Sequence, residues 1–299
     1  MTAAGVRPSS ARLYALLGAM LLFWSANFIF AKFAIRELPA VLVISLRTML
    51  AGVLMWPVYA FAREKFEPGM RGWTSKDVPL LATLGVLGVT GNQVLFIVGL
   101  SMTSVAHGAV ISAAAPLMVL LGATLMGLER FTAPKAAGML VAAAGVAVLQ
   151  LGRHQTGATM AGDLIMLASQ VVFAGFTVLS KRVAAQFGTI TLNAFAFICG
   201  GLVLLPYAVW EMSRLELVRV SPAAWMGIVY MALFPSIAGY LIYTYALRYL
   251  PASRVSSTSY LLPVVAPLFA VLFLGERPGM AFAGGAALVM GGVYTAERR

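Results

Sequence analysis

Ionisable side chains are scarce inside the apolar segments of this 299-residue sequence, so each is a candidate for handling a substrate. Arg47 lies about a third of the way into one segment and could hold a substrate carboxylate. Snorkelling, or a bond to a neighbouring carbonyl, is the structural alternative. His107 begins another segment and could bind substrate, sense pH or move a proton, or simply pack. With one cysteine, Cys199, and no second histidine nearby, we expect no metal site and no disulfide.

Uncharged polar and aromatic side chains are more numerous in the apolar segments. Besides Arg47 and His107, we expect the substrate to contact Trp24, Asn27, Asn92, Gln93, Phe96, Gln170, Phe173, Tyr240, Tyr243, Ser257 and Tyr260. Gln93 and Phe96 are three residues apart, as are Tyr240 and Tyr243, so each pair shares a helix face. An apolar cavity with aromatic walls and a few amides or hydroxyls suits a small amphipathic metabolite. The alternative is hydrogen bonding between helices.

Carboxylates are absent from the middle of the apolar segments. Asp163, Glu211, Glu129 and Glu276 all fall near segment ends. A pump that exchanges protons for cationic drugs needs a buried acid, so a neutral or zwitterionic substrate fits better. The sequence contains no clustered nucleophile, carboxylate pair or metal-ligand set, so we do not expect an enzyme. It contains no phosphate-binding loop, so we expect neither direct use of ATP nor another cofactor.

The elements that position these residues are apolar segments long enough to span a membrane as helices. The composition is 61% hydrophobic and 10% charged, whereas a soluble protein is about half apolar and a quarter charged. We expect an all-α protein with ten spans of about 20 residues. They lie near 12–33, 39–62, 78–100, 104–127, 133–151, 161–182, 189–210, 222–246, 252–274 and 278–296.

Lysine and arginine in the short loops predict the orientation. Apart from Arg47, the basic residues divide unequally between the two sides of the membrane. The smaller set lies on the side opposite the termini and consists of Lys32, Arg36, Arg153, Arg214, Arg219 and Arg277. The positive-inside rule then places both termini in the cytoplasm. The net charge of +11 reflects this bias, so we expect the lipid bilayer and a small molecule as partners, and no nucleic acid.

Two halves of the sequence, 1–152 and 153–299, resemble each other. A shift of 149 residues aligns Gly52 with Gly201 and Pro57 with Pro206. A shift of 147 aligns a second set of pairs, namely Pro116 with Pro263, Gly138 with Gly285, Gly145 with Gly292, and Glu129-Arg130 with Glu276-Arg277. Five spans per half is an odd number, so the second half enters the membrane inverted. Inverted repeats are common in secondary transporters, with the substrate site near the midplane.

Prolines and glycines predict where the spans bend and pack. Pro116, Pro263 and Pro267 interrupt spans four and nine, and we expect them to act as hinges or as static kinks. Pro235 interrupts span eight. The glycine-rich spans five and ten predict close helix packing, either within a monomer or at a homodimer contact.

Three motifs of the second half resemble the repeat of the EamA-type carriers in the drug/metabolite transporter superfamily. They are Ala-Leu-Arg-Tyr-Leu-Pro-Ala-Ser (246–253), Leu-Leu-Pro-Val-Val-Ala-Pro-Leu-Phe (261–269) and Leu-Gly-Glu-Arg-Pro (274–278). The first half is similar but looser, with Gly-Leu-Ser-Met-Thr-Ser-Val-Ala (99–106), Ala-Pro-Leu (115–117) and Gly-Leu-Glu-Arg (127–130). His107 departs from the pattern, where small residues are usual.

The resemblance covers essentially the whole chain and implies ten spans, a central cavity and cytoplasmic termini. The chain looks most like amino-acid exporters of the YddG type. We therefore expect a secondary transporter in a bacterial inner membrane that exports amino acids or similar metabolites by alternating access. The alternatives are a proton-coupled exporter of drugs or other metabolites, and a channel.

Overall fold

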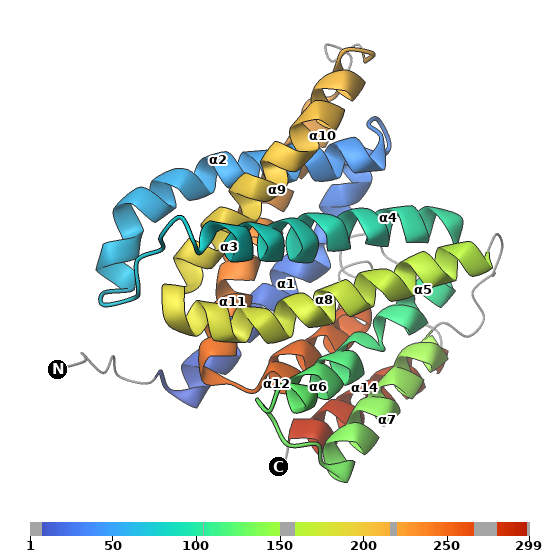
Figure 1. Ribbon diagram of the computed structural model, residues 1–299. Coiled ribbons are helices and arrows are strands. Elements are labelled where there is room, and N and C mark those ends of the chain that lie inside the picture. Colours follow the sequence, from blue (N-terminus) through green and yellow to red (C-terminus); the bar gives the residue numbers. More distant parts are fainter. Residues whose placement is uncertain (1–7, 104, 150–158, 216–219, 266–279, 298–299) are drawn as a thin grey trace. The chain divides into compact units, whose positions relative to one another are not determined.

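The computed structural model describes residues 8–103, 105–149, 159–215, 220–265 and 280–297. In these ranges the regular structure is helical and includes no strand (Figure 1). A backbone in hydrocarbon must satisfy its N–H and C=O groups within its own segment, which a helix does. The expected all-α class is therefore confirmed.

Within the described residues, six helical stretches are long and apolar enough to cross a membrane. They are Ser10–Ile35 (α1), Ala40–Phe66 (α2), Val78–Met102, Met160–Phe187 (α8), Thr189–Met212 (α9) and Pro222–Tyr249. Shorter apolar helices follow the expected spans four, five and ten, in α5 (Val105–Ser112) with α6 (Ala115–Leu125), α7 (Ala133–Leu149) and α14 (Met280–Glu297). The described part of span nine consists of α12 (Ala252–Ser257), the 3₁₀ turn η4 (Thr258–Leu261) and the residues that follow as far as 265. The described helices thus fall where the hydropathy of the sequence places spans.

Several spans change helix type along their length. Val78–Met102 consists of α3 (Val78–Gly85), the π-helical segment η1 (Val86–Gly91) and α4 (Asn92–Met102). Pro222–Tyr249 consists of α10 (Pro222–Met231), the π-helical segment η3 (Ala232–Gly239) and α11 (Tyr240–Tyr249). The shift of 147 residues maps 86–91 onto 233–238, so the two π segments occupy equivalent positions.

The span that contains Pro116 is also interrupted. Helix α5 ends at Ser112, and α6 begins at Ala115 with Pro116 in its first turn. Pro263 follows the 3₁₀ turn η4 at the equivalent place in span nine. Pro267 lies outside the described residues. A hinge at Pro116 or Pro263 stays a prediction.

The chain divides into two compact units, and each contains residues from both halves of the sequence. The first unit holds Met1–Val94 and Leu179–Tyr249. Its helices α2 and α9 pack closely at glycines that the repeat aligns. A β-carbon added at Gly52 would lie 2.8 Å from the carbonyl oxygen of Phe197, and one at Gly201 would lie 3.1 Å from the Cα of Met49. Small residues let two membrane helices approach at this crossing.

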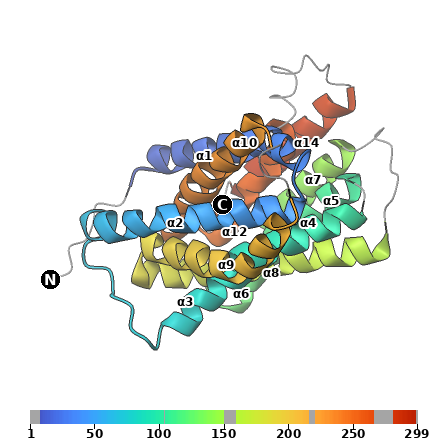
Figure 2. The ribbon, with the colours of Figure 1, turned by 90° about the horizontal axis from the view of Figure 1, so that it is seen from above.

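The second unit holds Leu95–Val178 and Leu250–Arg299, and its core forms where α7 packs on α14. The two helices lie side by side in both ribbon views (Figures 1 and 2). A β-carbon at Gly145 would lie 2.8 Å from the carbonyl oxygen of Gly285, and one at Gly292 would lie 2.4 Å from the backbone nitrogen of Ala142. The glycines that the repeat aligns in these two spans, Gly138, Gly145, Gly285 and Gly292, therefore serve packing within the chain.

Adding a methyl group at Gly292 is expected to lower the thermal stability of the purified protein. The new β-carbon would meet the backbone of α7, which cannot move aside like a flexible side chain, and overpacking costs about 1–3 kcal/mol. Gly291→Ala is the matched control, since a β-carbon there meets nothing within 4 Å. Melting temperatures in detergent should fall for Gly292→Ala and stay level or rise for Gly291→Ala, whose alanine favours the helix. Equal melting temperatures would contradict the packing.

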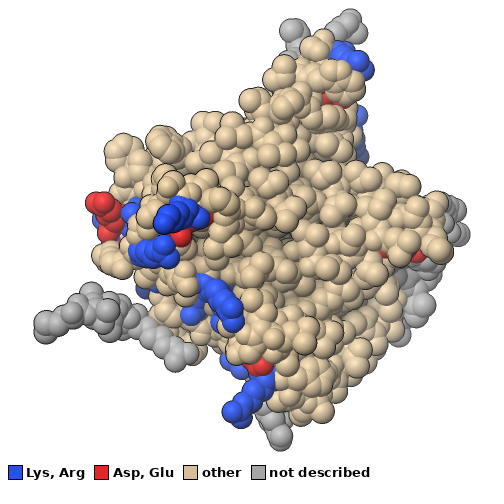
Figure 3. Space-filling view, viewed as in Figure 1, with Lys and Arg blue, Asp and Glu red and all other residues tan. Residues whose placement is uncertain are grey.

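The helix surfaces carry large apolar side chains, as a lipid environment requires. Leu125 is 88% exposed and Phe61 is 83% exposed. On the face drawn in Figure 3, charged side chains form a few small groups and uncharged side chains cover the rest. Water would penalise such a surface, whereas hydrocarbon accepts it.

Candidate functional site

Arg47 and Gln93 meet inside the first unit. Arg47 belongs to α2, and its terminal nitrogen Nη2 donates a hydrogen bond to Oε1 of Gln93, the second residue of α4. Tyr240, the first residue of α11, lies beside the side chains of both Gln93 and Arg47. One cluster thus combines a half-buried guanidinium, a half-buried amide and a buried phenol from both halves of the sequence.

Aromatic rings surround this polar cluster. The ring centroids of Trp24 and Tyr240 are 6.0 Å apart, and those of Trp24 and Tyr243 are 5.7 Å apart. Phe197 meets Tyr240 edge-on, with centroids 5.5 Å apart. These separations are typical of stabilising aromatic pairs. We call Trp24, Arg47, Gln93, Tyr240 and Tyr243 the Arg47 cluster.

The two π segments end at the cluster. Gln93 comes two residues after η1, and Tyr240 comes directly after η3. Pro235 in η3 has no N–H for the carbonyl of Met231, and the Ser236 hydroxyl donates to that carbonyl at 2.8 Å. The indole Nε1 of Trp24 donates to the carbonyl of Pro235 at 3.0 Å. Because π-helical turns occur frequently at functional sites, their position supports a function for this cluster.

Several buried polar atoms of the first unit have no hydrogen-bond partner in the structure. They include Nε of Arg47, Nε2 of Gln93, Oδ1 of Asn27, and the hydroxyls of Ser25, Thr48 and Thr90. Buried polar groups are normally paired, and each exception calls for an explanation. Unpaired atoms of both Arg47 and Gln93 lie in the proposed site, so a polar ligand could satisfy them.

The structure brings together five of the predicted contact residues, and they are the Arg47 cluster. Asn27 and Asn92 also belong to the first unit and are half-buried. Phe96, Gln170, Phe173, Ser257 and Tyr260 belong to the second unit. His107 lies in α5, and its side chain is outside the described part of the structure.

Three of the second-unit candidates have local roles in that unit. The Gln170 amide donates to the hydroxyl of Ser169 at 2.8 Å, and the Ser257 hydroxyl donates to the carbonyl of Ser253 at 2.7 Å. Tyr260 is 2% exposed and packs in the core with α7 and α14, although its hydroxyl has no partner. These contacts fit the structural alternative that the sequence left open, and their role in binding stays a prediction.

Phe197 and Gly239 contact the cluster but were not predicted from the sequence. A β-carbon at Gly239 would lie 2.6 Å from Nε1 of Trp24, so only glycine leaves room for the indole. The repeat does give a signal for Gly239, because the shift of 147 residues aligns it with the predicted Asn92. Phe197 lies in an apolar stretch and carries no such signal.

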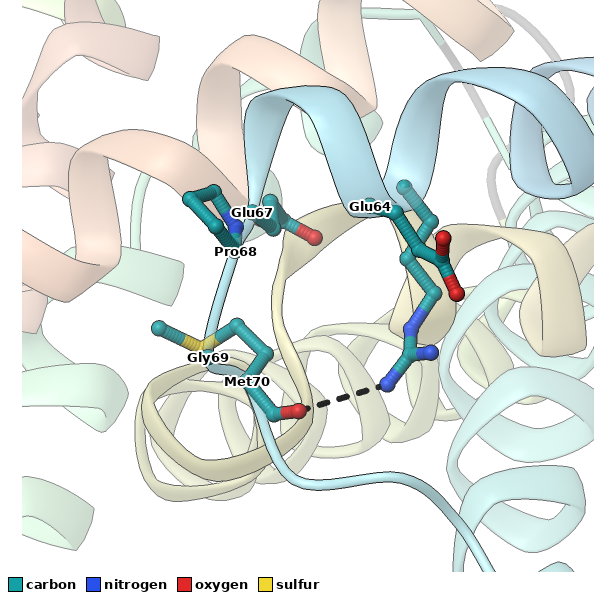
Figure 4. Close-up of a pocket in the computed structure, with 6 residues that line it drawn as sticks. Glu64, Glu67, Pro68, Gly69 and Met70 are labelled. Carbon is teal, nitrogen blue, oxygen red and sulfur yellow. Dashed lines mark hydrogen bonds between the residues drawn. The ribbon is translucent and has the colours of Figure 1, made fainter.

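A small pocket lies at the end of α2, away from mid-span. Its volume is about 330 Å³, and its lining consists of Arg63, Glu64, Glu67, Pro68, Gly69 and Met70 (Figure 4). Within it, Nη2 of Arg63 donates to the carbonyl of Met70 at 3.4 Å. The pocket adjoins a structural corner around Glu67.

Glu67 joins three helices at this corner. Its carboxylate accepts hydrogen bonds from the backbone nitrogens of Thr189 at 2.6 Å and Ile190 at 3.0 Å, in the first turn of α9. It also pairs with Nη1 of Arg248 at 3.0 Å, in the last turn of α11. A carboxylate at a helix start satisfies N–H groups that have no partner within the helix. We call this contact set the Glu67 corner.

Other acidic residues hold helix ends in a similar way. Glu37 accepts bonds from the nitrogen of Ser221 at 2.7 Å and from its hydroxyl at 2.6 Å, and these bonds lower the pKa of Glu37 below its usual value. Glu129 accepts from the nitrogen of Ser253 at 3.1 Å, and Asp163 accepts from the Thr103 hydroxyl. These acids therefore serve helix ends, as their positions in the sequence suggest.

Comparison with a family model gives two matches along the chain. Residues 10–151 and residues 160–296 each match the EamA-like transporter family. The two matches meet near the boundary that the internal alignment predicts.

Curated relatives of similar length include transporters from archaea and bacteria. The chain is 25% identical to an uncharacterized transporter of Archaeoglobus fulgidus, covering 95% of this chain and 97% of the relative. It is 27% identical to an uncharacterized transporter of Bacillus subtilis, covering 95% of this chain and 93% of the relative. It is 31% identical to a probable terminal-alkyne amino-acid exporter of Streptantibioticus cattleyicolor, covering 77% of each.

A crystal structure shares the fold. The TM-score is 0.80 at 22% sequence identity, and the alignment covers 97% of this chain and all of the other. At this identity the likeness concerns the fold alone.

Proposed function

The chain belongs to the EamA-like transporter family and is a multi-pass membrane protein, and we propose that it is a secondary transporter that exports amino acids or similar small metabolites. The Arg47 cluster carries this proposal, because it places a cation, an amide and several aromatic rings inside apolar helices. Ionisable residues inside a membrane are expensive and usually functional. The amino-acid exporter among the relatives supports the substrate class.

The proposed architecture is ten spans in two inverted five-helix halves, 1–152 and 153–299, with both termini in the cytoplasm. The equivalent positions of η1 and η3 support a duplicated plan, as do the two separate family matches. The distribution of lysine and arginine supports the orientation. The bacterial relatives support a location in a bacterial inner membrane.

The proposed mechanism is alternating access around a central site. The interruption between α5 and α6 and the π segments η1 and η3 are departures from straight helices, and such breaks line cavities and serve as hinges in transporters. Because Gln93 and Tyr240 begin the α-helical turns after the π segments, a change in either segment would move a residue of the Arg47 cluster. Substrate contact and helix movement would therefore be coupled.

Transport by proteoliposomes tests the function and its site together. Loading the purified protein into liposomes and following a panel of labelled amino acids, with and without a pH gradient, should identify transported species. Gln93→Ala and Tyr240→Ala should each lower the initial rate by about tenfold or more, since the first removes the hydrogen-bond acceptor of Arg47 and the second removes the phenol that lies beside Arg47 and Gln93. Gln186→Ala, at an exposed position outside the cluster, should keep the parental rate.

Two results would count against the proposal in different ways. Absence of transport for every amino acid would remove the substrate class. Parental rates in both Gln93→Ala and Tyr240→Ala would remove the site while leaving the transporter assignment intact.

A further inference from the structure

Arg47 carries a half-buried charge in the first third of α2, and it has no carboxylate partner among the described residues. It lies seven residues into α2, about 11 Å along the helix at the usual rise. Its described bond is the one to Gln93, its Nε is unpaired, and no acidic side chain in the described ranges pairs with it. A neutral amide is a weaker partner for guanidinium than a carboxylate, which can accept two parallel N–H bonds. The site therefore keeps a positive charge that an anionic ligand can neutralise.

We propose that Arg47 binds the carboxylate of the transported substrate, and that Gln93 takes the place of this carboxylate in the empty carrier. This inference rests on the proposed function and specifies the group that its substrate must carry. The unpaired Nε of Arg47 supplies a second donor for the carboxylate, and the unpaired Nε2 of Gln93 supplies a third. Displacement of Gln93 from Arg47 would leave its amide beside the ligand, so the unpaired atoms of Arg47 and Gln93 would both gain a partner.

The surrounding aromatic rings select the rest of the ligand. Tyr240 lies beside both Arg47 and Gln93, and Trp24 packs against Tyr240 and Tyr243. An apolar or aromatic group attached to the carboxylate would pack against these rings. The cluster holds no acid to pair with an ammonium group, so binding requires the carboxylate and does not require the ammonium. The ligand class is an amphipathic monocarboxylate, of which apolar amino acids are members.

Four related probes separate these requirements in a thermal-shift assay on the full-length protein in detergent. L-phenylalanine has both charged groups, 3-phenylpropionate lacks the ammonium, and phenethylamine and L-phenylalanine methyl ester lack the carboxylate. A ligand that binds the folded state raises the melting temperature. We expect both carboxylates to stabilise the protein at millimolar concentration, and the two compounds without a carboxylate to leave it unchanged. Equal stabilisation by phenethylamine, or none by either carboxylate, would overturn the inference.

Variants of the pair test whether the stabilisation depends on Arg47. Arg47→Gln should weaken the binding of both carboxylates by about tenfold or more, the value of a charge-assisted hydrogen bond. Gln93→Glu should weaken the binding of both carboxylates equally, because the introduced carboxylate would itself pair with the guanidinium of Arg47 and exclude the ligand. Arg47 would still have a partner in this variant, so the fold should be retained. Arg36→Gln removes a positive charge at an exposed position beyond α1 and should bind both carboxylates normally. Parental affinity in Gln93→Glu would contradict the proposal.

The same experiments distinguish failure of the inference from failure of the proposed function. Arg47-dependent binding of 3-phenylpropionate, together with no transport of any amino acid, would retain the carboxylate site and reject amino-acid export. Transport of phenylalanine that is unchanged in Arg47→Gln would retain amino-acid export and reject the carboxylate site.

Discussion

Gly239→Ala is expected to lower the transport rate by about 10- to 100-fold while the protein still folds. The added β-carbon would lie 2.6 Å from Nε1 of Trp24, closer than real β-carbons approach a neighbour. The indole is held by its bond to the Pro235 carbonyl and by Tyr240 and Tyr243, so it must move relative to the cluster. Misplacement of a binding group by about 1 Å can cost a factor of about 100. Initial rates in proteoliposomes measure the effect.

A control variant and a double variant make this prediction specific. Gly18→Ala lies on α1, the helix that carries Trp24, and its β-carbon would meet nothing within 4 Å, so transport should be unchanged. Trp24→Phe is smaller and loses the indole N–H. Adding Gly239→Ala to Trp24→Phe should therefore cost much less than adding it to the parental protein, because contacting residues are not additive. Additive losses would show that Gly239 acts through some other contact.

The positions of the spans could be predicted from the sequence, because each depends on the hydropathy of its own residues. The observed Thr189–Met212 begins where the sequence places the seventh span. The proximity of Gln93 and Tyr240 could also be predicted, because the shift of 147 residues aligns these two positions. A repeat relates positions that experience the same environment, so it carries information that hydropathy lacks.

The partners of individual side chains could not be predicted in this way. The shift of 149 residues aligns Trp24 with Phe173, but Trp24 belongs to the first unit and Phe173 to the second, so a shared role for the two stays a prediction. The partner of Arg47 depends on the rotation of α4, which the preceding π segment η1 sets. The segment η1 contains no proline, whereas η3 contains Pro235, so only the helix interruption at η3 could be predicted from the sequence. A single extra residue per turn changes which face a helix presents.

The Glu67 corner shows a further limit of sequence reasoning, because Glu67 reads as an ordinary charge in a basic loop. Its role depends on Gly188, whose φ of +88° turns the chain from α8 into α9 and aims the N–H groups of α9 at the carboxylate. A β-carbon at Gly188 would lie 2.2 Å from Oε2 of Glu67. The positive φ favours glycine at position 188, and the short distance to Glu67 leaves no room for a β-carbon there. The partners are 122 residues apart in sequence, so no local pattern reveals them.

Glu67→Ala is accordingly expected to destabilise the protein more than any other substitution considered for the first unit. It leaves Arg248 without its carboxylate and two N–H groups of α9 without an acceptor. The side chain of Glu67 is 5% exposed and that of Arg248 is 14% exposed, so the pair is largely shielded from water, and breaking a fully buried pair costs about 3–5 kcal/mol. Glu67→Gln should also be destabilising, because its amide nitrogen would face donors.

Glu64→Ala is the matched control for this prediction, and Arg248→Ala separates the two functions of Glu67. Glu64 lines the same pocket one turn earlier but is exposed, so its loss should change the melting temperature little (Figure 4). Arg248→Ala removes the ion pair but keeps both bonds to α9, so it should cost less than Glu67→Ala. The order of melting temperatures in detergent should therefore be Glu64→Ala above Arg248→Ala above Glu67→Ala. If Arg248→Ala matched Glu67→Ala, the bonds to α9 would contribute nothing measurable, and the stabilising effect of Glu67 would come from its ion pair with Arg248 alone.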